Sequence, residues 1–195
     1  MPFYVPDELR DEFIRDGKFF ITKIDGESIH SLQSWIVKSR RGDNSRIKFT
    51  IVINSSGGSP GLILYFSSFM KTLSPEVEIT GVTFGECGSA ALALLQCCHV
   101  RIAVKDTGFF IHHVNGTVTL SCHDSTSLRI KREIEQSVKL EAELVKLQTK
   151  RSGISIPKWK SLADAGETSP GQAIFTSEAK KLGLIDKVID SYPLF

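Results

Sequence analysis

The sequence has no strong excess of charge of either sign, which excludes several classes of partner. Its 195 residues include 24 basic and 22 acidic ones, for a formal net charge of +2 at pH 7. The two signs are interspersed, so the chain offers no extended field for a phosphate backbone or an anionic membrane. The basic run at 38–41 (KSRR) is short and indicates a solvated loop. We therefore expect neither nucleic acid nor a membrane as a partner.

Long apolar runs are also missing, and cysteine is scarce. No segment is long and apolar enough to span a bilayer, and residues 1–8 lack the basic start and apolar core of a secretory signal. The four cysteines include no CxxC pair, and the adjacent Cys97 and Cys98 lie in an apolar stretch typical of reduced core thiols. These absences predict a cytoplasmic protein that needs no metal or other cofactor.

What the chain does contain is enough apolar sequence for one domain with a sizeable core, since 41% of its residues are hydrophobic. Apolar runs alternate with helical patterns, and the run at 48–53 is typical of a parallel strand buried on both faces. The long helix at 125–150 has one apolar stripe among many charges, so it should bury a single face. We expect an α/β fold of repeated βα units with one protruding helix. The pattern predicts strands at 19–24, 48–53, 77–83, 100–104, 109–111 and 184–186, and helices at 27–37, 62–73, 90–98, 125–150 and 177–182.

The segment GECGSAA at 85–91 places Ser89 between a glycine-containing turn and an apolar helix. A hydroxyl there can lie at the positive end of the helix dipole, with main-chain N–H groups facing the same space. This is the environment of an activated serine nucleophile. A serine at the start of a helix is more often only its N-cap, so the turn by itself does not identify Ser89 as a nucleophile.

A second glycine-containing loop, NSSGGSPG at 54–61, directly follows the buried strand at 48–53. Its glycines let main-chain N–H groups turn toward a common point, as an oxyanion hole requires. A nucleotide-binding loop is disfavoured because the GxxxxGK[ST] spacing is absent and no lysine follows Gly61. A flexible turn between a strand and a helix is the simpler alternative.

The third feature is the pair His112-His113 at the end of the short strand at 109–111. One of these imidazoles can act as general base for Ser89 by accepting its proton. A metal site is disfavoured, because neither acidic residues nor cysteines flank the pair closely enough. A buried histidine satisfied within the core is the remaining alternative.

In this collinear order, the three motifs resemble those of the caseinolytic protease (ClpP) family. NSSGG at 54–58 is similar to the family's Asn-Ser-Pro-Gly-Gly loop, GECGS at 85–89 to its Gly-x-Ala-Ala-Ser turn, and FIH at 110–112 to its Met-Ile-His. The tail SEAKKLGLID at 177–186 is similar to the family's Glu-Ala-x-x-x-Gly-Leu-Ile-Asp ending. The likeness runs from about residue 17 to residue 189, which makes it far more specific than any single motif.

The resemblance implies a ClpP/crotonase-type α/β fold, a βαβ spiral in which the helix at 125–150 is the handle that joins stacked rings of a homo-oligomer. It implies an N-terminal segment at 1–16 and a single peptidase domain at 17–195. The family generally carries a longer N-terminal segment, which meets an ATP-driven (AAA+) unfoldase. Docking to such an unfoldase is therefore an expectation from the family, and these residues do not show it.

The activity that the resemblance implies is that of a serine endopeptidase, which hydrolyses peptide bonds of unfolded polypeptides inside an oligomeric chamber. Carried over by position, Ser89 is the nucleophile and His112 is the base. The oxyanion hole is assigned to the main-chain N–H groups of Gly57, Gly58 and Ala90.

The match fails at the third member of the triad. An ungapped count back from Gly183 places the family's acid at Gly171, and glycine cannot orient a histidine. Glu167 or Asp164 is expected to substitute, with Asp124 as a weaker candidate. Loss of the acid lowers the rate of a Ser-His-Asp protease by roughly ten-thousand-fold. A weak or inactive subunit with a structural role in the ring therefore stays open, as does, less favoured, crotonase-type acyl-CoA chemistry.

Overall fold

The structure, a computed structural model, describes residues 7–41, 46–115, 126–168 and 173–192. The described part of the chain alternates strands and helices, as predicted. The elements in chain order are α1 (Asp7–Arg15), β1 (Lys18–Ile21), α2 (Gly26–Arg41), β2 (Lys48–Ser55), α3 (Pro60–Met70), β3 (Glu78–Gly88), α4 (Ser89–Cys97), β4 (Val100–Val104), β5 (Gly108–Phe110), α5 (Thr126–Ser152), α6 (Ile156–Thr168), β6 (Ile174–Phe175), α7 (Thr176–Lys181) and β7 (Lys187–Ile189).

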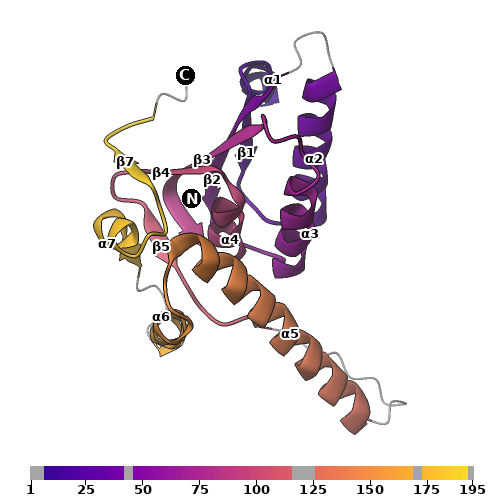
Figure 1. Ribbon diagram of the computed structural model, residues 1–195, viewed down its shortest axis with the longest axis vertical. Helices are drawn as coiled ribbons and strands as arrows, with labels where there is room; N and C mark the ends of the chain where they lie inside the picture. Colours follow the sequence, from indigo (N-terminus) through magenta and orange to yellow (C-terminus); the bar gives the residue numbers. More distant parts are fainter. Residues whose placement is uncertain (1–6, 42–45, 116–125, 169–172, 193–195) are drawn as a thin grey trace.

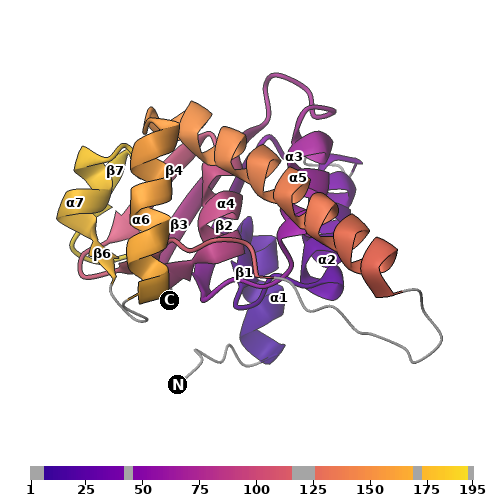
Figure 2. The ribbon, with the colours of Figure 1, turned by 90° about the horizontal axis from the view of Figure 1, so that it is seen from below.

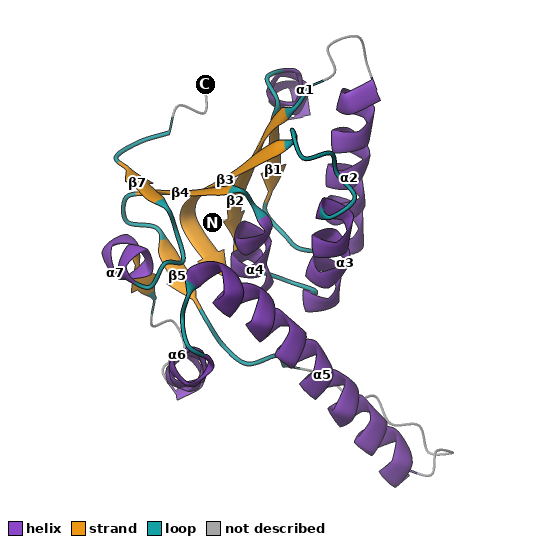
Figure 3. Cartoon of the chain, in the orientation of Figure 1, coloured by secondary structure: helices purple, strands orange, loops and turns teal. Residues whose placement is uncertain are grey.

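The strands form one mixed sheet with a parallel centre in the order β1-β2-β3-β4-β7. β5 pairs in parallel with the end of β3, and the short β6 pairs antiparallel to β5. β2 is buried at Phe49 and from Ile51 to Ile53, as a central strand covered on both faces must be. Figure 3 shows the strands as one twisted layer with α2 and α3 beside it. The predicted α/β fold of βα units is confirmed.

β3 is the strand that organises the site, because its two halves pair with different neighbours. Residues 80–83 pair with β4, and residues 86–88 pair with β5. Between them the register with β2 shifts, at a bulge that contains Gly85 with φ of +67°. The side chain of Asn54 supports this bulge by accepting a hydrogen bond from the Glu86 N–H at 3.3 Å. The strand predicted at 77–83 therefore continues to Gly88 and delivers the chain directly to Ser89.

α4 and α5 differ sharply in burial. All residues of α4 from Ala90 to Gln96 are buried, so the helix opened by Ser89 is fixed within the core. The buried residues in the described part of α5 lie toward its C-terminal end, at Leu144, Val145 and Gln148, while Leu128 and Val138 are 60% and 63% exposed. Figures 1 and 2 show α5 extending away from the body of the molecule. The predicted protruding helix is present, and none of the helices in the described ranges is long and apolar enough to cross a membrane.

Arg101 of β4 links the C-terminal part of the chain to the sheet through hydrogen bonds. Its buried guanidinium donates to both carboxylate oxygens of Asp186 at 2.6 and 3.1 Å, and to the main-chain oxygen of Gly183 at 2.8 Å. Gln96 Oε1 of α4 accepts a further bond at 2.6 Å. These bonds to Arg101 lower the pKa of Asp186. Two stretches of the chain that are distant in sequence, 96–101 and 183–186, therefore meet at one permanently charged side chain.

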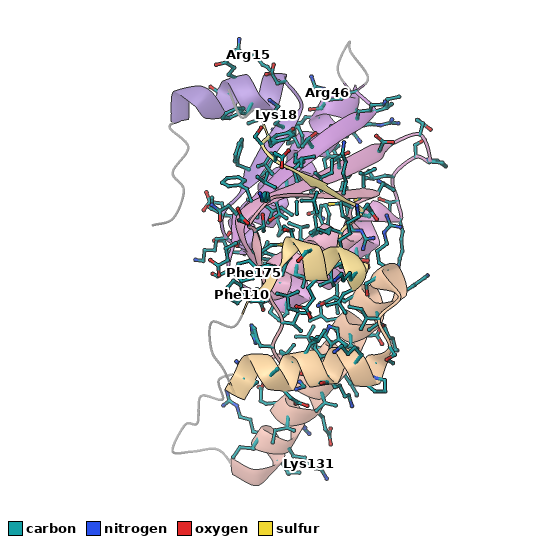
Figure 4. The ribbon with its side chains drawn as sticks, turned by 90° about the vertical axis from the view of Figure 1, so that its left-hand side faces the viewer. Arg15, Lys18, Arg46, Phe110, Lys131 and Phe175 are labelled. Carbon is teal, nitrogen blue, oxygen red and sulfur yellow. The ribbon has the colours of Figure 1, made fainter. Side chains whose placement is uncertain are left out.

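The structure also contains elements that the sequence patterns did not indicate. α1 packs on β1 through Phe13 and Phe20, whose ring centroids lie 4.7 Å apart. The guanidinium of Arg46, which precedes β2, donates to the main-chain oxygen of Arg15 at the end of α1 (Figure 4). The helix α6 was not predicted at all.

The strand predicted at 184–186 is wrong, because the strand begins at Lys187 and pairs with β4. Leu184 and Ile185 are buried at 0% and 3% exposure without belonging to a strand. Their apolar character therefore indicates that these residues are buried, and it does not indicate that they pair in a strand.

Candidate active site

Ser89 lies at the junction of β3 and α4 in an uncommon backbone conformation. Its φ is +49°, a value that few residues other than glycine adopt. Gly88 is extended and no side chain caps the N-terminus of α4. The N–H groups of the first helical turn have no acceptor within the helix, so the positive end of the α4 dipole lies at Ser89. Backbone strain of this kind persists where surrounding structure enforces it, and it concentrates at functional sites.

The loop after β2 contacts the Ser89 turn through Gly57. This residue has φ of +124°, and a Cβ there would lie 2.8 Å from the Ser89 Cβ and 3.1 Å from the Ala90 nitrogen. No side chain fits in that space. The Gly57 N–H itself donates to Ser55 Oγ at 3.1 Å. Gly57 therefore allows the loop to approach the Ser89 turn, while its N–H is directed to a neighbouring hydroxyl.

Gly58 presents its main-chain N–H differently. The Ile24 N–H donates to the Gly57 oxygen at 2.9 Å, and the Ser59 N–H donates to the Ile24 oxygen at 2.8 Å. In this parallel bridge between Ile24 and Gly58, the N–H of Gly58 itself points away from Ile24. Gly58 and Ala90 both line a cavity with Ser89. They are the better placed of the three predicted oxyanion donors.

The same cavity is lined by His112 and His113, which follow β5. Trp159 of α6 and Glu141 of α5 also line it. The structure therefore gathers the predicted nucleophile, both candidate bases and two predicted oxyanion donors around one space, although they come from three separate segments of the chain.

His112 has a main-chain acceptor beside it. Its Nδ1 lies 2.6 Å from the carbonyl oxygen of His113 and 3.9 Å from Glu167 Oε1. A carbonyl oxygen only accepts hydrogen bonds, so Nδ1 must carry the proton. In the neutral ring Nε2 then has a free lone pair, which is the form a general base requires.

His113 is held between two carboxylates from different helices. Its Nδ1 lies 2.9 Å from Glu141 Oε1 of α5, and its Nε2 lies 2.9 Å from Asp164 Oδ1 of α6. The bonds to Asp164 and then to Glu141 raise the pKa of His113. Both bonds are made at once only by the imidazolium, because a neutral ring has a single N–H. No group of three metal-ligating side chains within the described ranges is arranged to hold a metal ion.

Glu141 also fixes the chain beyond His113. Its second carboxylate oxygen, Oε2, accepts a hydrogen bond from the Val114 N–H at 3.0 Å. Of the two predicted third members, Asp164 contacts His113, and Glu167 lies near His112. Asp124 and Gly171, the other positions considered for an acid, lie outside the described residues.

A model of the family described as Clp protease matches residues 15–192. The chain belongs to the Clp protease family. Membership confirms the predicted resemblance and makes the chain a ClpP-like peptidase at the family level, within a family of serine peptidases. Clp proteases typically form oligomeric rings. Among curated proteins no match was found.

Two other residues around this Clp-protease site are not indicated by any sequence pattern. A Cβ at Gly166 of α6 would lie 2.1 Å from the main-chain oxygen of Ile111, so this glycine lets α6 rest on the segment that carries His112. Glu141 is one of several acids in α5, and nothing in its spacing distinguishes it from Glu135 or Glu143. Both positions matter only through contacts between distant segments, so the sequence carried no usable signal for them.

Proposed function

We propose that this Clp protease family member is a serine endopeptidase in which Ser89 is the nucleophile and His112 is the general base. The observation that carries the proposal is the strained backbone of Ser89 at the uncapped start of α4, beside the cavity that His112 also lines. A serine that served only as an N-cap would have its side chain bonded to the first turn, and its backbone would not need a positive φ.

In the proposed reaction, Ser89 Oγ attacks the carbonyl carbon of a peptide bond and its proton passes to His112 Nε2. The oxyanion that forms accepts hydrogen bonds from the N–H groups of Gly58 and Ala90, with Gly57 the third predicted donor. His112 then gives the proton to the leaving amine, and the peptide C–N bond breaks. Water then attacks the acyl carbon while the same imidazole takes its proton. The ester bond to Ser89 Oγ breaks, and the imidazolium returns the proton to Oγ.

Glu167 is the predicted acid that lies near His112, where it can attract the charged imidazolium but does not form a hydrogen bond with the ring. Its carboxylate oxygen lies 3.9 Å from His112 Nδ1, which is within ion-pair range but beyond hydrogen-bond distance. The Glu167 side chain is 42% exposed, so solvent weakens its attraction for an imidazolium. Asp164, the other candidate, would have to leave His113 to take this role.

The proposed assembly is a homo-oligomer of stacked rings whose chamber admits unfolded polypeptides. Exposed apolar residues on the projecting half of α5, Leu128, Ile134 and Val138, support it, because such a stripe favours burial against another subunit. In this proposal residues 17–195 form the peptidase domain and 1–16 form an N-terminal segment. An ATP-driven unfoldase partner and a cytoplasmic location stay predictions from the sequence.

The test is covalent labelling of purified protein with a fluorophosphonate probe. We expect Ser89 Oγ to displace fluoride from phosphorus, and Ser89→Ala or His112→Ala to abolish labelling. Peptide mapping locates the modified residue, and Ser68→Ala, which changes an exposed serine of α3 that does not line the cavity, is the matched control. An intact oligomer that is not labelled would instead support a subunit with a structural role.

A further inference from the structure

The peptide group between His113 and Val114 makes two hydrogen bonds that link the candidate base to α5. On one side its carbonyl oxygen lies 2.6 Å from His112 Nδ1. On the other side its N–H donates to Glu141 Oε2 at 3.0 Å. The carbonyl and N–H of one trans peptide point in opposite directions. Glu141 therefore holds the peptide from the side opposite to His112.

Glu141 is positioned to fix this peptide because its carboxylate bonds to the chain at two points. Its Oε1 lies 2.9 Å from His113 Nδ1, and its Oε2 accepts from the Val114 N–H. The peptide group thus has little freedom to rotate. A carboxylate bonded to the N–H also polarises the peptide and makes its carbonyl oxygen a stronger acceptor.

We propose that this peptide group orients His112 in place of a triad carboxylate, and that Glu141 is a positioning residue that acts through it. The proposal rests on the function proposed for Ser89 and His112. The carbonyl performs two of the tasks of a triad acid: it fixes the ring plane, and it selects the tautomer with the proton on Nδ1. It carries only a partial charge, so it stabilises the imidazolium less than a carboxylate would.

Glu167 is the competing explanation, and geometry separates the two. A donor and acceptor 3.9 Å apart do not form a hydrogen bond, whereas 2.6 Å is a short one. Glu167 can attract the charged form of His112, but it does not select a tautomer at that distance. The positioning role therefore belongs to the peptide and Glu141.

The experiment compares fluorophosphonate labelling rates of Glu141→Gln and Glu167→Gln in the full chain across a range of pH. Glu143→Gln is the matched control, since Glu143 lies on the same helix and pairs with the exposed Lys146. We expect Glu141→Gln to slow labelling by about tenfold or more, as small errors of position do at catalytic groups. Glu143→Gln should stay within about twofold of the natural protein, and Glu167→Gln should slow labelling less than Glu141→Gln does. Equal rates for Glu141→Gln and the natural protein, or a larger loss in Glu167→Gln, would overturn the proposal.

A second readout does not depend on Ser89 being reactive. Nuclear magnetic resonance of ¹⁵N-histidine-labelled protein reports which ring nitrogen of His112 carries the proton, with the signal assigned by its loss in His112→Gln. We expect the Nδ1–H tautomer in the natural protein and in Glu167→Gln, and a mixture of tautomers in Glu141→Gln. If the natural protein is not labelled but shows this tautomer pattern, the proposed activity fails while the positioning role stands. An Nε2–H tautomer in the natural protein would refute the positioning role itself.

Discussion

Arg101 and His113 are each held between acceptors from distant segments, but only His113 can become neutral as the pH rises, because arginine stays protonated. The Arg101 guanidinium is buried and bonds to Asp186, Gln96 and the Gly183 carbonyl, and it stays protonated at any physiological pH. His113 lies at the cavity, with its side chain 30% exposed, between Glu141 and Asp164. Similar electrostatics thus support permanent structure in one region and an adjustable arrangement in the other.

The two clusters also differ in what depends on them. The Arg101 cluster joins β4, α4 and the chain before β7. None of the residues of this cluster lines the cavity. The His113 cluster joins α5 and α6 to the segment that carries His112. We therefore expect disruption of the Arg101 cluster to lower the stability of the fold. Disruption of the His113 cluster should instead change the reactivity of Ser89.

The largest effect on stability is expected from Arg101→Leu. Removal of the guanidinium leaves the Gly183 carbonyl without its bond and leaves the Asp186 carboxylate only the main-chain N–H of residue 101. We expect the free energy of unfolding to fall by about 3 kcal/mol. The figure lies at the low end for buried pairs because the Asp186 side chain is 39% exposed and can be rehydrated. Chemical denaturation followed by circular dichroism measures the change.

A second prediction for Arg101→Leu concerns the reactivity of Ser89. The fraction that remains folded should label at Ser89 at close to the natural rate. A large loss of labelling in fully folded protein would show that the two clusters are not independent.

The next effect concerns the contact between α6 and the His112 segment. Gly166→Ala gains helix propensity of about 1 kcal/mol, but its Cβ would lie 2.1 Å from the Ile111 carbonyl oxygen. Main chain cannot rotate away as a side chain can, so α6 must move and carry Asp164 with it. We expect labelling of Ser89 to slow by about tenfold or more.

Gly61→Ala is the matched control for that change, because Gly61 lies in α3 and a Cβ there meets nothing within 4 Å. It should leave the labelling rate unchanged and stability the same or slightly higher. If the two alanine variants label equally fast, the packing of α6 does not position His112.

The smallest effect is the pH dependence of the His113 cluster. Because Asp164 and Glu141 raise the pKa of His113, this pairing adds most stability at acidic pH, below the ordinary value of 6.5. The contribution is lost as the pH rises through the raised pKa, when His113 becomes neutral and keeps one donor. Glu141 faces it from α5 and Asp164 from α6, with Glu167 of α6 nearer His112.

The measurement for this prediction is the difference in unfolding free energy between the natural protein and His113→Gln, which is neutral at every pH. The difference should shrink as the pH rises above 6.5. The corresponding difference for Arg101→Leu should stay constant over the same interval, and a parallel decline in both variants would remove the distinction between the clusters.

Local patterns were sufficient for much of this fold. The strand predicted at 100–104 has the bounds of β4, and Ser89 does begin a buried helix. Both depend on apolar runs and turn residues that are contiguous in sequence. The strand predicted at 77–83 ends too early because Gly85 indicates a turn in the sequence, whereas it lies in a bulge that β2 and β5 stabilise from either side.

The site was predictable only in part, for a related reason. Ser89 and His112 each follow a recognisable strand, so their motifs could be found. Glu141 and Gly166 matter because two helices far along the chain reach the residues after β5, and no local spacing encodes that meeting. An acid near Gly171 is needed only where a side chain orients the imidazole, whereas the ring of His112 lies against a main-chain carbonyl.

The hydrogen bond between His112 and the His113 carbonyl also bears on how such sites change during evolution. A carbonyl oxygen is present whichever amino acid occupies position 113, so no point mutation at that codon deletes it. An aspartate can be lost by a single nucleotide change. A subunit that relies on its main chain can therefore lack the acid of its family in an alignment and still keep the imidazole in place.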